Sequence, residues 1–383
     1  MASPILWLTE NYPPQRGGMS QSCDRIISHL RQIGYEIHVI HFTNKGGRVG
    51  RVQQLNGTYW NVPFQESEAQ TLHLAWQHIA PEHFSMIVCF GGYLPVLAAP
   101  VYASWLSLPL VTLLRGNDFD TAIFTPRKRD LLRDACQAAK VVCTVSSDKV
   151  EKIRTFFSVQ DVRFIANGIT SHDWFLSEGD KTYAHQWRAE NLAGKICLGL
   201  FGQMKAKKGL SFLADALDGS ALASRVHLLL VGDVQEPDLA LLGRLGVSYT
   251  ALNFVDRFEL LRHYACCDAV LIPSLYDGMP NVLLEAGALG IPVMASAVDG
   301  MRDVIEHSVS GLLFAPVEES ALRKVLFEFI EYSEASRQAL GRQLQQTIQT
   351  IYTVENETKK YDQLFREILG ASGAAFRVHQ SNQ

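Results

Sequence analysis

Residues 269–285 read Ala-Val-Leu-Ile-Pro-Ser-Leu-Tyr-Asp-Gly-Met-Pro-Asn-Val-Leu-Leu-Glu, and this stretch decides the fold of the chain. The apolar run 269–272 is typical of a buried parallel strand. It is followed by a loop that contains Asp277 and Pro280, and apolar residues on one face predict a helix from residue 281 onward. A strand, a short loop and a helix in this order indicate an α/β protein with a parallel sheet.

The loop and the helix start also suit a nucleotide-sugar ligand. A helix N-terminus beside a glycine-containing loop presents unpaired backbone N–H groups and a positive dipole end, which bind phosphate. The carboxylates of Asp277 and Glu285 lie at either end of the turn and can accept hydrogen bonds from sugar or ribose hydroxyls. The alternative is an ordinary strand–loop–helix with a capped helix start. The remaining motifs favour the nucleotide-sugar site.

The composition is that of a two-domain globular protein. A chain of 383 residues is too long for one ordinary core and matches two domains of about 150–200 residues. With 19% charged residues and a net charge of −4, nothing favours nucleic acid as a partner. The seven cysteines form no C-x-x-C pair, which indicates free thiols in a reducing compartment. We expect a cytoplasmic protein, because no signal peptide is visible and no apolar stretch reaches the roughly 20 residues that span a bilayer.

Strand-like runs alternate with helical patterns in both halves of the sequence. The predicted strands are Ile5–Thr9, Ile37–Phe42, Met86–Phe90, Leu110–Leu114, Val141–Val145, Val162–Ile165, Ile196–Phe201, Val226–Val231, Ala269–Ile272 and Pro292–Ala295. The predicted helices include Met19–Ile33, Ser67–Ile79, Arg127–Ala138, 210–217, 258–266 and 281–289. This alternation predicts two Rossmann-like domains with a cleft between them, whose ligands bind beyond the C-termini of the strands.

The alternation stops once, between Thr170 and Gly194, where polar residues show no clear period. We therefore predict an N-terminal domain 1–170, a linker 171–194 and a C-terminal domain 195–354. An amphipathic helix is expected at about 355–370, followed by a loose tail 371–383.

Four motifs follow one another along nearly the whole chain. They are Gly17-Gly18 after the first strand, Asn167-Gly168-Ile169 before the linker, Phe201-Gly-Gln-Met-Lys-Ala-Lys-Lys-Gly209, and Asp277-x7-Glu285 between Pro273-Ser274 and Gly-Ile-Pro-Val293. This set resembles the family-4 glycosyltransferases, which are retaining enzymes of the GT-B fold. The resemblance implies two Rossmann-like domains that face each other across a cleft, with the C-terminal helix crossing back to the first domain.

The resemblance also implies roles for individual residues. The C-terminal domain binds a nucleoside-diphosphate sugar, with Glu285 at the ribose, Asp277 at the transferred sugar, Lys208 at the leaving diphosphate and the base near Val255. The N-terminal domain binds the acceptor. The implied donor-binding residues are Gly17, Gly18, Gly202, Gln203, Lys208, Val255, Asp277, Gly278, Met279, Pro280, Asn281, Val282 and Glu285. The implied catalytic residues are Lys208, Asp277, Arg115 and Asp118.

The sequence departs from the family pattern at two basic positions. Gln203 stands where the family has an arginine, which removes a charge and a bidentate phosphate donor, and either Lys205 or Lys207 can compensate. Arg115 stands where members often have a histidine near the transferred sugar, so the role of that histidine is not carried over. Arg115 and Asp118 are expected either in the cleft or in a loop cap with a salt bridge.

Neither a metal nor a cofactor is expected. Asp118-x-Asp120 matches the metal-binding D-x-D pattern of another glycosyltransferase fold, but so short a pattern recurs by chance. No pair of histidines has the spacing of zinc ligands. The basic run Arg127-Lys128-Arg129 begins a helix that either touches anionic lipid or is a solvated face.

The sequence therefore predicts a retaining, metal-independent glycosyltransferase that moves a sugar from a nucleoside diphosphate to a glycan or lipid-linked acceptor. UDP-glucose is the default donor, and polysaccharide or cell-envelope biosynthesis is the default pathway. The prediction includes a weak peripheral contact with the inner face of the membrane and leaves the oligomeric state open. The alternatives are a sugar-nucleotide epimerase, a phosphorylase with pyridoxal phosphate, and a nucleotide-sugar-binding protein without turnover.

Overall fold

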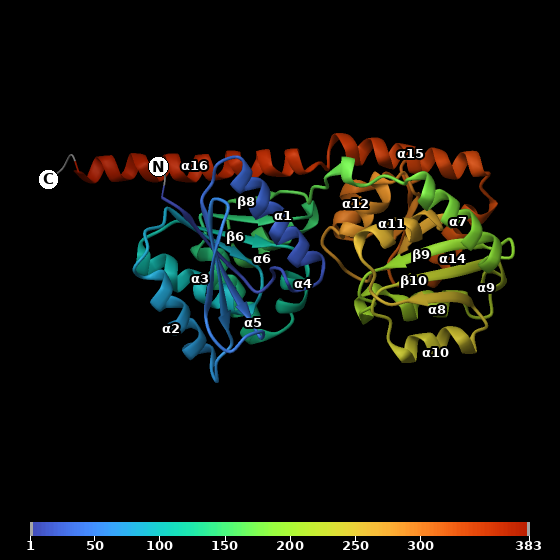
Figure 1. Cartoon of the computed structure of the whole chain (residues 1–383), viewed down its shortest axis with the longest axis horizontal. Helices are drawn as coiled ribbons and strands as arrows, with labels where there is room; N and C mark the ends of the chain where they lie inside the picture. The colour runs from blue at the N-terminus through green and yellow to red at the C-terminus, as the bar shows by residue number, and fades with distance from the viewer. Residues whose placement is uncertain (1–2, 381–383) are drawn as a thin grey trace. The chain divides into compact units, whose positions relative to one another are not determined.

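The computed structural model describes residues 3–380, which divide into two units (Figure 1). Unit 1 comprises Met1–Ala166 together with Val354–Gln383, and unit 2 comprises Asn167–Thr353. The chain therefore leaves unit 1, builds all of unit 2, and returns to unit 1 with its last helix.

Within residues 3–166, eight strands form one sheet in the order β3-β4-β2-β1-β5-β6-β7-β8. Only the β3–β4 pair is antiparallel, and every other pair is parallel. The strands are β1 Ile5–Thr9, β2 Ile37–Thr43, β3 Gly50–Gln54, β4 Gly57–Pro63, β5 Met86–Phe90, β6 Leu110–Leu114, β7 Val141–Thr144 and β8 Val162–Phe164. The helices of unit 1 are α1 Gly18–Gln32, α2 Glu68–Ile79, α3 Tyr93–Leu106, α4 Asn117–Ala122, α5 Pro126–Ala138, α6 Ser147–Phe157 and α16 Val354–Gln380.

Helices cover both faces of this sheet because alternate strand residues point to opposite sides. Leu6 and Leu8 of β1 belong to a core that is shared with α2, α3, α5 and α6. Ile5 and Trp7 of the same strand belong to a second core that is shared with α1 and α16. Helix α16 is thus an integral part of unit 1 and packs beside α1 (Figure 1).

Within residues 167–353, six strands form a fully parallel sheet in the order β11-β10-β9-β12-β13-β14. The strands are β9 Ile196–Phe201, β10 Val226–Val231, β11 Ser248–Leu252, β12 Ala269–Ile272, β13 Val293–Ser296 and β14 Leu312–Phe314. The α-helices are α7 Glu178–Asn191, α8 Leu210–Leu217, α9 Leu222–Arg225, α10 Glu236–Arg244, α11 Arg257–Ala265, α12 Asn281–Ala288, α13 Asp299–Val304, α14 Glu319–Glu331 and α15 Glu334–Thr350. Two single turns, η1 Ser171–Asp173 and η2 Ala206–Lys208, are 3₁₀-helical.

The strands and helices predicted from the sequence are present, and their ends lie within one residue of the predicted ends, apart from the C-terminal helix. That helix runs through Gln380, beyond the predicted end at about residue 370, and residues 381–383 of the predicted tail 371–383 lie outside the described chain. Because 371–380 contains no proline, nothing in its backbone chemistry ends the helix at Gly370. The stretch 171–194, predicted as a linker, holds η1 and α7, and α7 packs on α11.

In both sheets, the order in which the chain adds strands reverses at an internal position. In unit 2 the chain winds outward from β9 to β11 and then restarts at β12 on the other side of β9. In unit 1 the corresponding position lies between β1 and β5. Loops that follow two such neighbouring strands diverge to opposite faces of the sheet, and the crevice between them is where open α/β sheets bind ligands.

Candidate functional site

The loops after β9 and β12 contact each other at the point in the unit 2 sheet where the strand order reverses. The backbone N–H of Leu275 donates to the carbonyl of Lys207 at 2.8 Å, which ties the two loops together. Gly209 has φ +73°, and a Cβ on it would lie 2.0 Å from the carbonyl oxygen of Pro273. Only glycine permits that approach, because any side chain would push the loops apart.

Asp277 is the electrostatic centre of this region. Its carboxylate accepts from Lys208 Nζ at 2.6 Å and from Lys207 Nζ at 3.2 Å, and all three side chains are largely buried. It also accepts from the backbone N–H of Gly278 at 3.0 Å. Burial alone raises the pKa of Asp277, but the two ammonium groups outweigh it and lower this pKa to about 2. The carboxylate is therefore ionised at neutral pH.

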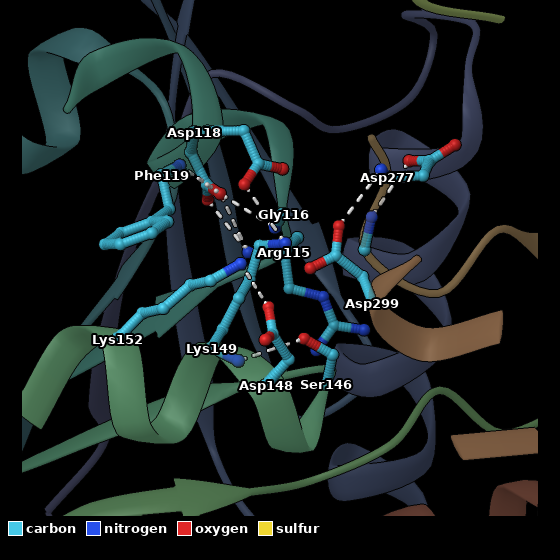
Figure 2. Close-up of polar contacts among 12 residues, drawn as sticks. Arg115, Gly116, Asp118, Phe119, Ser146, Asp148, Lys149, Lys152, Asp277 and Asp299 are labelled. Carbon is cyan, nitrogen blue, oxygen red and sulfur yellow. Dashed lines mark hydrogen bonds and ion pairs between the residues drawn. The ribbon is translucent and has the colours of Figure 1, made fainter. Parts of the chain in front are cut away.

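The turn before helix α12 is fixed by two groups from elsewhere in the chain. Asn167 donates its side-chain amide to the carbonyl of Met279 at 2.6 Å. Asp299 accepts from the backbone N–H of Asp277 at 3.2 Å, as Figure 2 shows. The N-cap of α12 is Pro280, which offers no side-chain cap hydrogen bond. The backbone at the start of α12 is thus held in place with its positive dipole end toward the loops.

Glu285 lies one turn into α12 and is oriented by an aromatic pair. Tyr264 of α11 donates its hydroxyl to Glu285 Oε2 at 2.8 Å. The ring of Tyr264 is fully buried and stacks on Phe201 at the end of β9, with ring centroids 4.0 Å apart. Burial first, and then the charge of Glu285, raises the pKa of Tyr264 well above its usual value, so the phenol stays protonated and acts as a donor.

Other predicted donor-binding residues lie in the loops after β9 and β11. Gly202 follows β9 with φ +102°, and the exposed Gln203 donates to Asp233 Oδ2 at 3.4 Å, in the loop after β10. Gln203 and Lys205 help to line a hollow of about 340 Å³ between the loops after β9 and β10. Val255 is half-buried in the loop after the edge strand β11, two strands away from β9.

In unit 1, the predicted residues lie after β1 and β6. Gly17 is the N-cap of α1 and has φ +126°, a conformation that favours glycine, and Gly18 begins that helix. After β1, Glu10 caps helix α3 by accepting from the backbone N–H of Leu94 at 2.6 Å, and burial raises the pKa of Glu10.

Arg115 and Asp118, the other predicted catalytic residues, lie directly after β6 and are held there by hydrogen bonds. Asp118 accepts from the backbone N–H groups of Arg115, Gly116 and Phe119 at 2.9–3.0 Å (Figure 2). Burial nevertheless raises the pKa of Asp118.

The guanidinium of Arg115 is buried against helix α16. It donates to Tyr361 Oη at 3.0 Å and lies 3.6 Å from a carboxylate oxygen of Glu357. These contacts favour the alternative of a loop cap and a salt bridge over a role at the sugar. Asp120 pairs instead with Lys149, at 3.1 Å, and residues 3–380 contain no cluster of three His, Cys, Asp or Glu side chains that could hold a metal ion.

The sequence alone missed several residues of this arrangement. Tyr264 and Asp299 belong to no sequence motif, and Asn167 belongs to the Asn-Gly-Ile motif, which predicts no contact with Met279. Their partners are 21, 22 and 112 residues away in the chain, and no local pattern relates residues at such separations. The seven cysteines are free thiols, and all except the half-buried Cys267 are buried.

Two Rossmann-like units joined in this way, with the last helix returned to the first unit, define the GT-B class of glycosyltransferases. Residues 16–172 match the sequence model described as Glycosyltransferase Family 4, and residues 195–331 match that of Glycosyl transferases group 1. The chain belongs to this family and is a glycosyltransferase.

Individual proteins agree with this assignment. An uncharacterised glycosyltransferase of Methanocaldococcus jannaschii is 29% identical over 340 residues, covering 82% of this chain and 85% of that protein. The structure of sucrose-phosphate synthase from Thermosynechococcus elongatus matches with a TM-score of 0.83 at 17% identity, covering 96% of this chain and all of that one. Anabaena HepE, solved in complex with UDP-glucose, matches with a TM-score of 0.77 at 18% identity over 95% and 99% of the two chains. Across residues 3–380, no helix is both long and apolar enough to cross a membrane.

Proposed function

We propose that this glycosyltransferase takes its sugar from a nucleoside diphosphate bound at the carboxyl edge of the unit 2 sheet. The observation that carries the proposal is the convergence of Lys208, Asp277 and the N-terminus of α12 where the strand order of the sheet reverses. Cationic side chains and a helix N-terminus are the groups that bind a diphosphate. The carboxylates of Asp277 and Glu285 are suited to hydroxyl groups of the sugar and the ribose.

The proposed reaction retains the configuration of the transferred carbon. The acceptor hydroxyl oxygen forms a bond to that carbon on the face from which the diphosphate leaves. The bond from the carbon to the phosphate oxygen breaks, and a donor phosphate oxygen takes the acceptor's proton. Lys208 and the dipole of α12 stabilise the negative charge that develops on the departing diphosphate. No protein nucleophile and no obligatory metal enter this scheme.

The other predicted contacts complete the proposal. The backbone of Gly278, Met279, Asn281 and Val282 borders the diphosphate or the sugar, and Pro280 fixes the start of the helix. Gly202 and Gln203 border the same ligand from the loop after β9, and the base lies near Val255. The proposed donor contacts also include Gly17 and Gly18, whose glycine backbone permits close approach to a ligand. Unit 1 binds a glycan or lipid-linked acceptor.

UDP-glucose is the proposed donor, and polysaccharide or cell-envelope biosynthesis is the proposed pathway. The complex of the similarly folded HepE with UDP-glucose supports the choice of donor. For a lipid-linked acceptor, the basic start of α5 is the proposed peripheral contact with a membrane. Arg127 there is exposed and is paired with Glu68 at 2.9 Å.

The test begins with binding. UDP, GDP, ADP and their glucose or mannose conjugates are added to the full chain, and the melting temperature is recorded. A ligand at 100 times its Kd stabilises the folded state by about 2.7 kcal/mol, so a cognate nucleotide raises the melting temperature measurably. Absence of any shift with all of these nucleotides would contradict the donor site.

Turnover is then measured with and without a glycan acceptor. We expect Lys208→Ala to reduce kcat by about 100-fold or more, because it removes a preorganised charge at the leaving group. Glu285→Ala is expected to weaken donor binding by about tenfold or more, because it removes charged hydrogen bonds. Lys195→Ala, which lies before β9 and outside the site, is the control. Release of a free isomerised nucleotide sugar without an acceptor would indicate an epimerase, and binding without any turnover a binding protein.

A further inference from the structure

The loop after β9 carries more lysines than the family motif requires. The motif lysine directly before Gly209 is Lys208, and Lys205 and Lys207 are additional. Gln203 meanwhile lacks the charge of the family's arginine. Lys205 and Lys207 are the two candidates to replace the charge of that arginine. Their side chains lie in different surroundings, which distinguishes them.

Lys207 belongs to the same cluster as Lys208. Its Nζ lies 3.2 Å from Oδ1 of Asp277, while that of Lys208 lies 2.6 Å from Oδ2, so the two ammonium groups occupy the two oxygens of one carboxylate. The side chain of Lys207 is only 14% exposed, and that of Lys208 is 23% exposed. Both charges are therefore partly desolvated, which strengthens their attraction to an anion.

Lys207 is also held in its conformation by the loop after β12. Its carbonyl accepts from the N–H of Leu275 at 2.8 Å, and its ammonium group lies 5.5 Å from the ring centre of Tyr276. A lysine that is fixed in this way loses less side-chain entropy when it binds a ligand. The cation is thus preorganised beside the start of α12.

Lys205 and Gln203 lie at the hollow between the loops after β9 and β10. Lys205 is exposed and lines this hollow together with Gln203 and Asp233. The amide of Gln203 donates to Asp233 in the loop after β10, and Asp277 is not among the residues that line this hollow. Lys207, in contrast, contacts the carboxylate of Asp277 directly.

We infer that Lys207 is a second diphosphate-binding residue, which supplies the positive charge that Gln203 cannot. This inference rests on the proposed donor site. In it, Lys207 and Lys208 contact the diphosphate oxygens from the loop after β9, and the backbone N–H groups at the start of α12 contact them from the other side. Asp277 keeps both ammonium groups in position and remains ionised.

The test replaces single lysines of this loop with methionine, which is uncharged. Lys207→Met keeps an unbranched side chain of similar size and removes the ammonium group, including its contact with the ring of Tyr276. The Kd of UDP, GDP and ADP is measured by calorimetry for the full chain, and the tightest nucleotide is used for all variants. We expect Lys207→Met to raise this Kd by about tenfold, and Lys205→Met, the matched control on the same loop, to change it less than twofold.

The decisive measurement is a rescue. Gln203→Arg is added to Lys207→Met, which restores the family's arginine in the absence of the extra lysine. We expect the double variant to regain a Kd within about threefold of the original protein. A lysine that served only to hold Asp277 would not be replaced by an arginine at position 203, so a failed rescue would overturn the inference.

Two further outcomes are distinguishable. If no nucleotide binds the unchanged protein, or if Lys208→Met binds as well as that protein does, the donor site itself is wrong. If Lys208→Met weakens binding and Lys207→Met does not, or if Lys205→Met weakens it equally, only the role of Lys207 is wrong. Circular dichroism of each variant, recorded at the temperature of the titration, establishes that the chain is folded.

Discussion

At the scale of single residues, the ionised carboxylate of Asp277 orders two lysines. In the proposed donor site it also faces the sugar. Its folded pKa of about 2 lies below the ordinary value of 3.8, so the unfolded chain takes up the proton first as the pH falls. The stabilisation from this carboxylate is complete above about pH 4 and is lost as the pH falls from there toward 2.

The lowered pKa of Asp277 gives a direct prediction for the stability of the Asp277→Asn variant. The variant is expected to be less stable than the original protein at pH 6, because two buried ammonium groups lose their counter-charge. The difference should shrink as the pH is lowered to 3, since the original protein then loses the same contribution. Urea unfolding at pH 6, 4 and 3 measures it, and a difference independent of pH would contradict the ion cluster.

Tyr264 is predicted to be a positioning residue for Glu285. Tyr264→Phe removes one hydroxyl and keeps the stacking on Phe201, so Glu285 loses its 2.8 Å donor while the core keeps its volume. We expect the KM for the donor to rise by about three- to tenfold with little change in kcat. The effect should be smaller with a 2′-deoxyribose donor, which a merely structural role would not produce.

The control for Tyr264 is a second phenol that donates to a carboxylate elsewhere in unit 2. Tyr332 donates to Glu328 on α14, away from the loops after β9 and β12. Tyr332→Phe should leave the KM unchanged. Equal effects of the two substitutions would remove the argument for Tyr264.

At the scale of secondary-structure elements, the proposed donor site depends on close contact between the loops after β9 and β12. Gly209→Ala places a Cβ where Pro273 has its carbonyl oxygen, in a backbone conformation that L-residues rarely adopt. We expect a loss of about 2 kcal/mol or more in the free energy of unfolding, measured in urea, together with weaker nucleotide binding.

The matched control is Gly243→Ala in helix α10. A Cβ at Gly243 meets no atom within 4 Å, and alanine is a better helix former by about 1 kcal/mol. This substitution should leave the chain as stable as before or more stable. A neutral Gly209→Ala would show that the two loops can separate without cost.

The elements also show what a single sequence can and cannot predict. Long apolar runs predicted the central strands correctly, because a parallel strand that is buried on both faces consists almost entirely of apolar residues. The β3–β4 hairpin was missed although Asn56-Gly57 is a strong hairpin signal, because its exposed strand β3 lacks an apolar run. Helix α7 was missed although Ser177 and Asp180 form a capping box. The contacts of Asn167 with Met279 and of Asp299 with Asp277 depend on tertiary packing and have no local signal.

At the scale of the whole molecule, helix α16 decides which parts of the chain fold together. Tyr361, Leu364 and Phe365 of this helix are buried in the core of unit 1, on the face of the sheet that it shares with α1. Beside them, Glu357 pairs with Arg25 at 2.9 Å and with Arg115 at 3.6 Å. The last segment of the sequence is therefore required to complete the first domain, whereas the predicted donor residues, apart from Gly17 and Gly18, lie in unit 2.

This organisation predicts that Glu357→Gln destabilises unit 1 selectively. The substitution keeps the shape of the side chain but leaves two largely buried guanidinium groups without their carboxylate, which costs about 3 kcal/mol when a buried pair is broken. Glu367→Gln on the same helix is the control, since its pair with Arg163 is exposed to solvent and contributes little to stability. Calorimetry should then resolve two unfolding transitions in the Glu357 variant, of which only the upper one responds to added nucleotide, because the ligand stabilises the unit that binds it. A single transition that shifts as a whole with nucleotide would mean that the two units unfold together. The prediction of selective destabilisation of unit 1 would then be wrong.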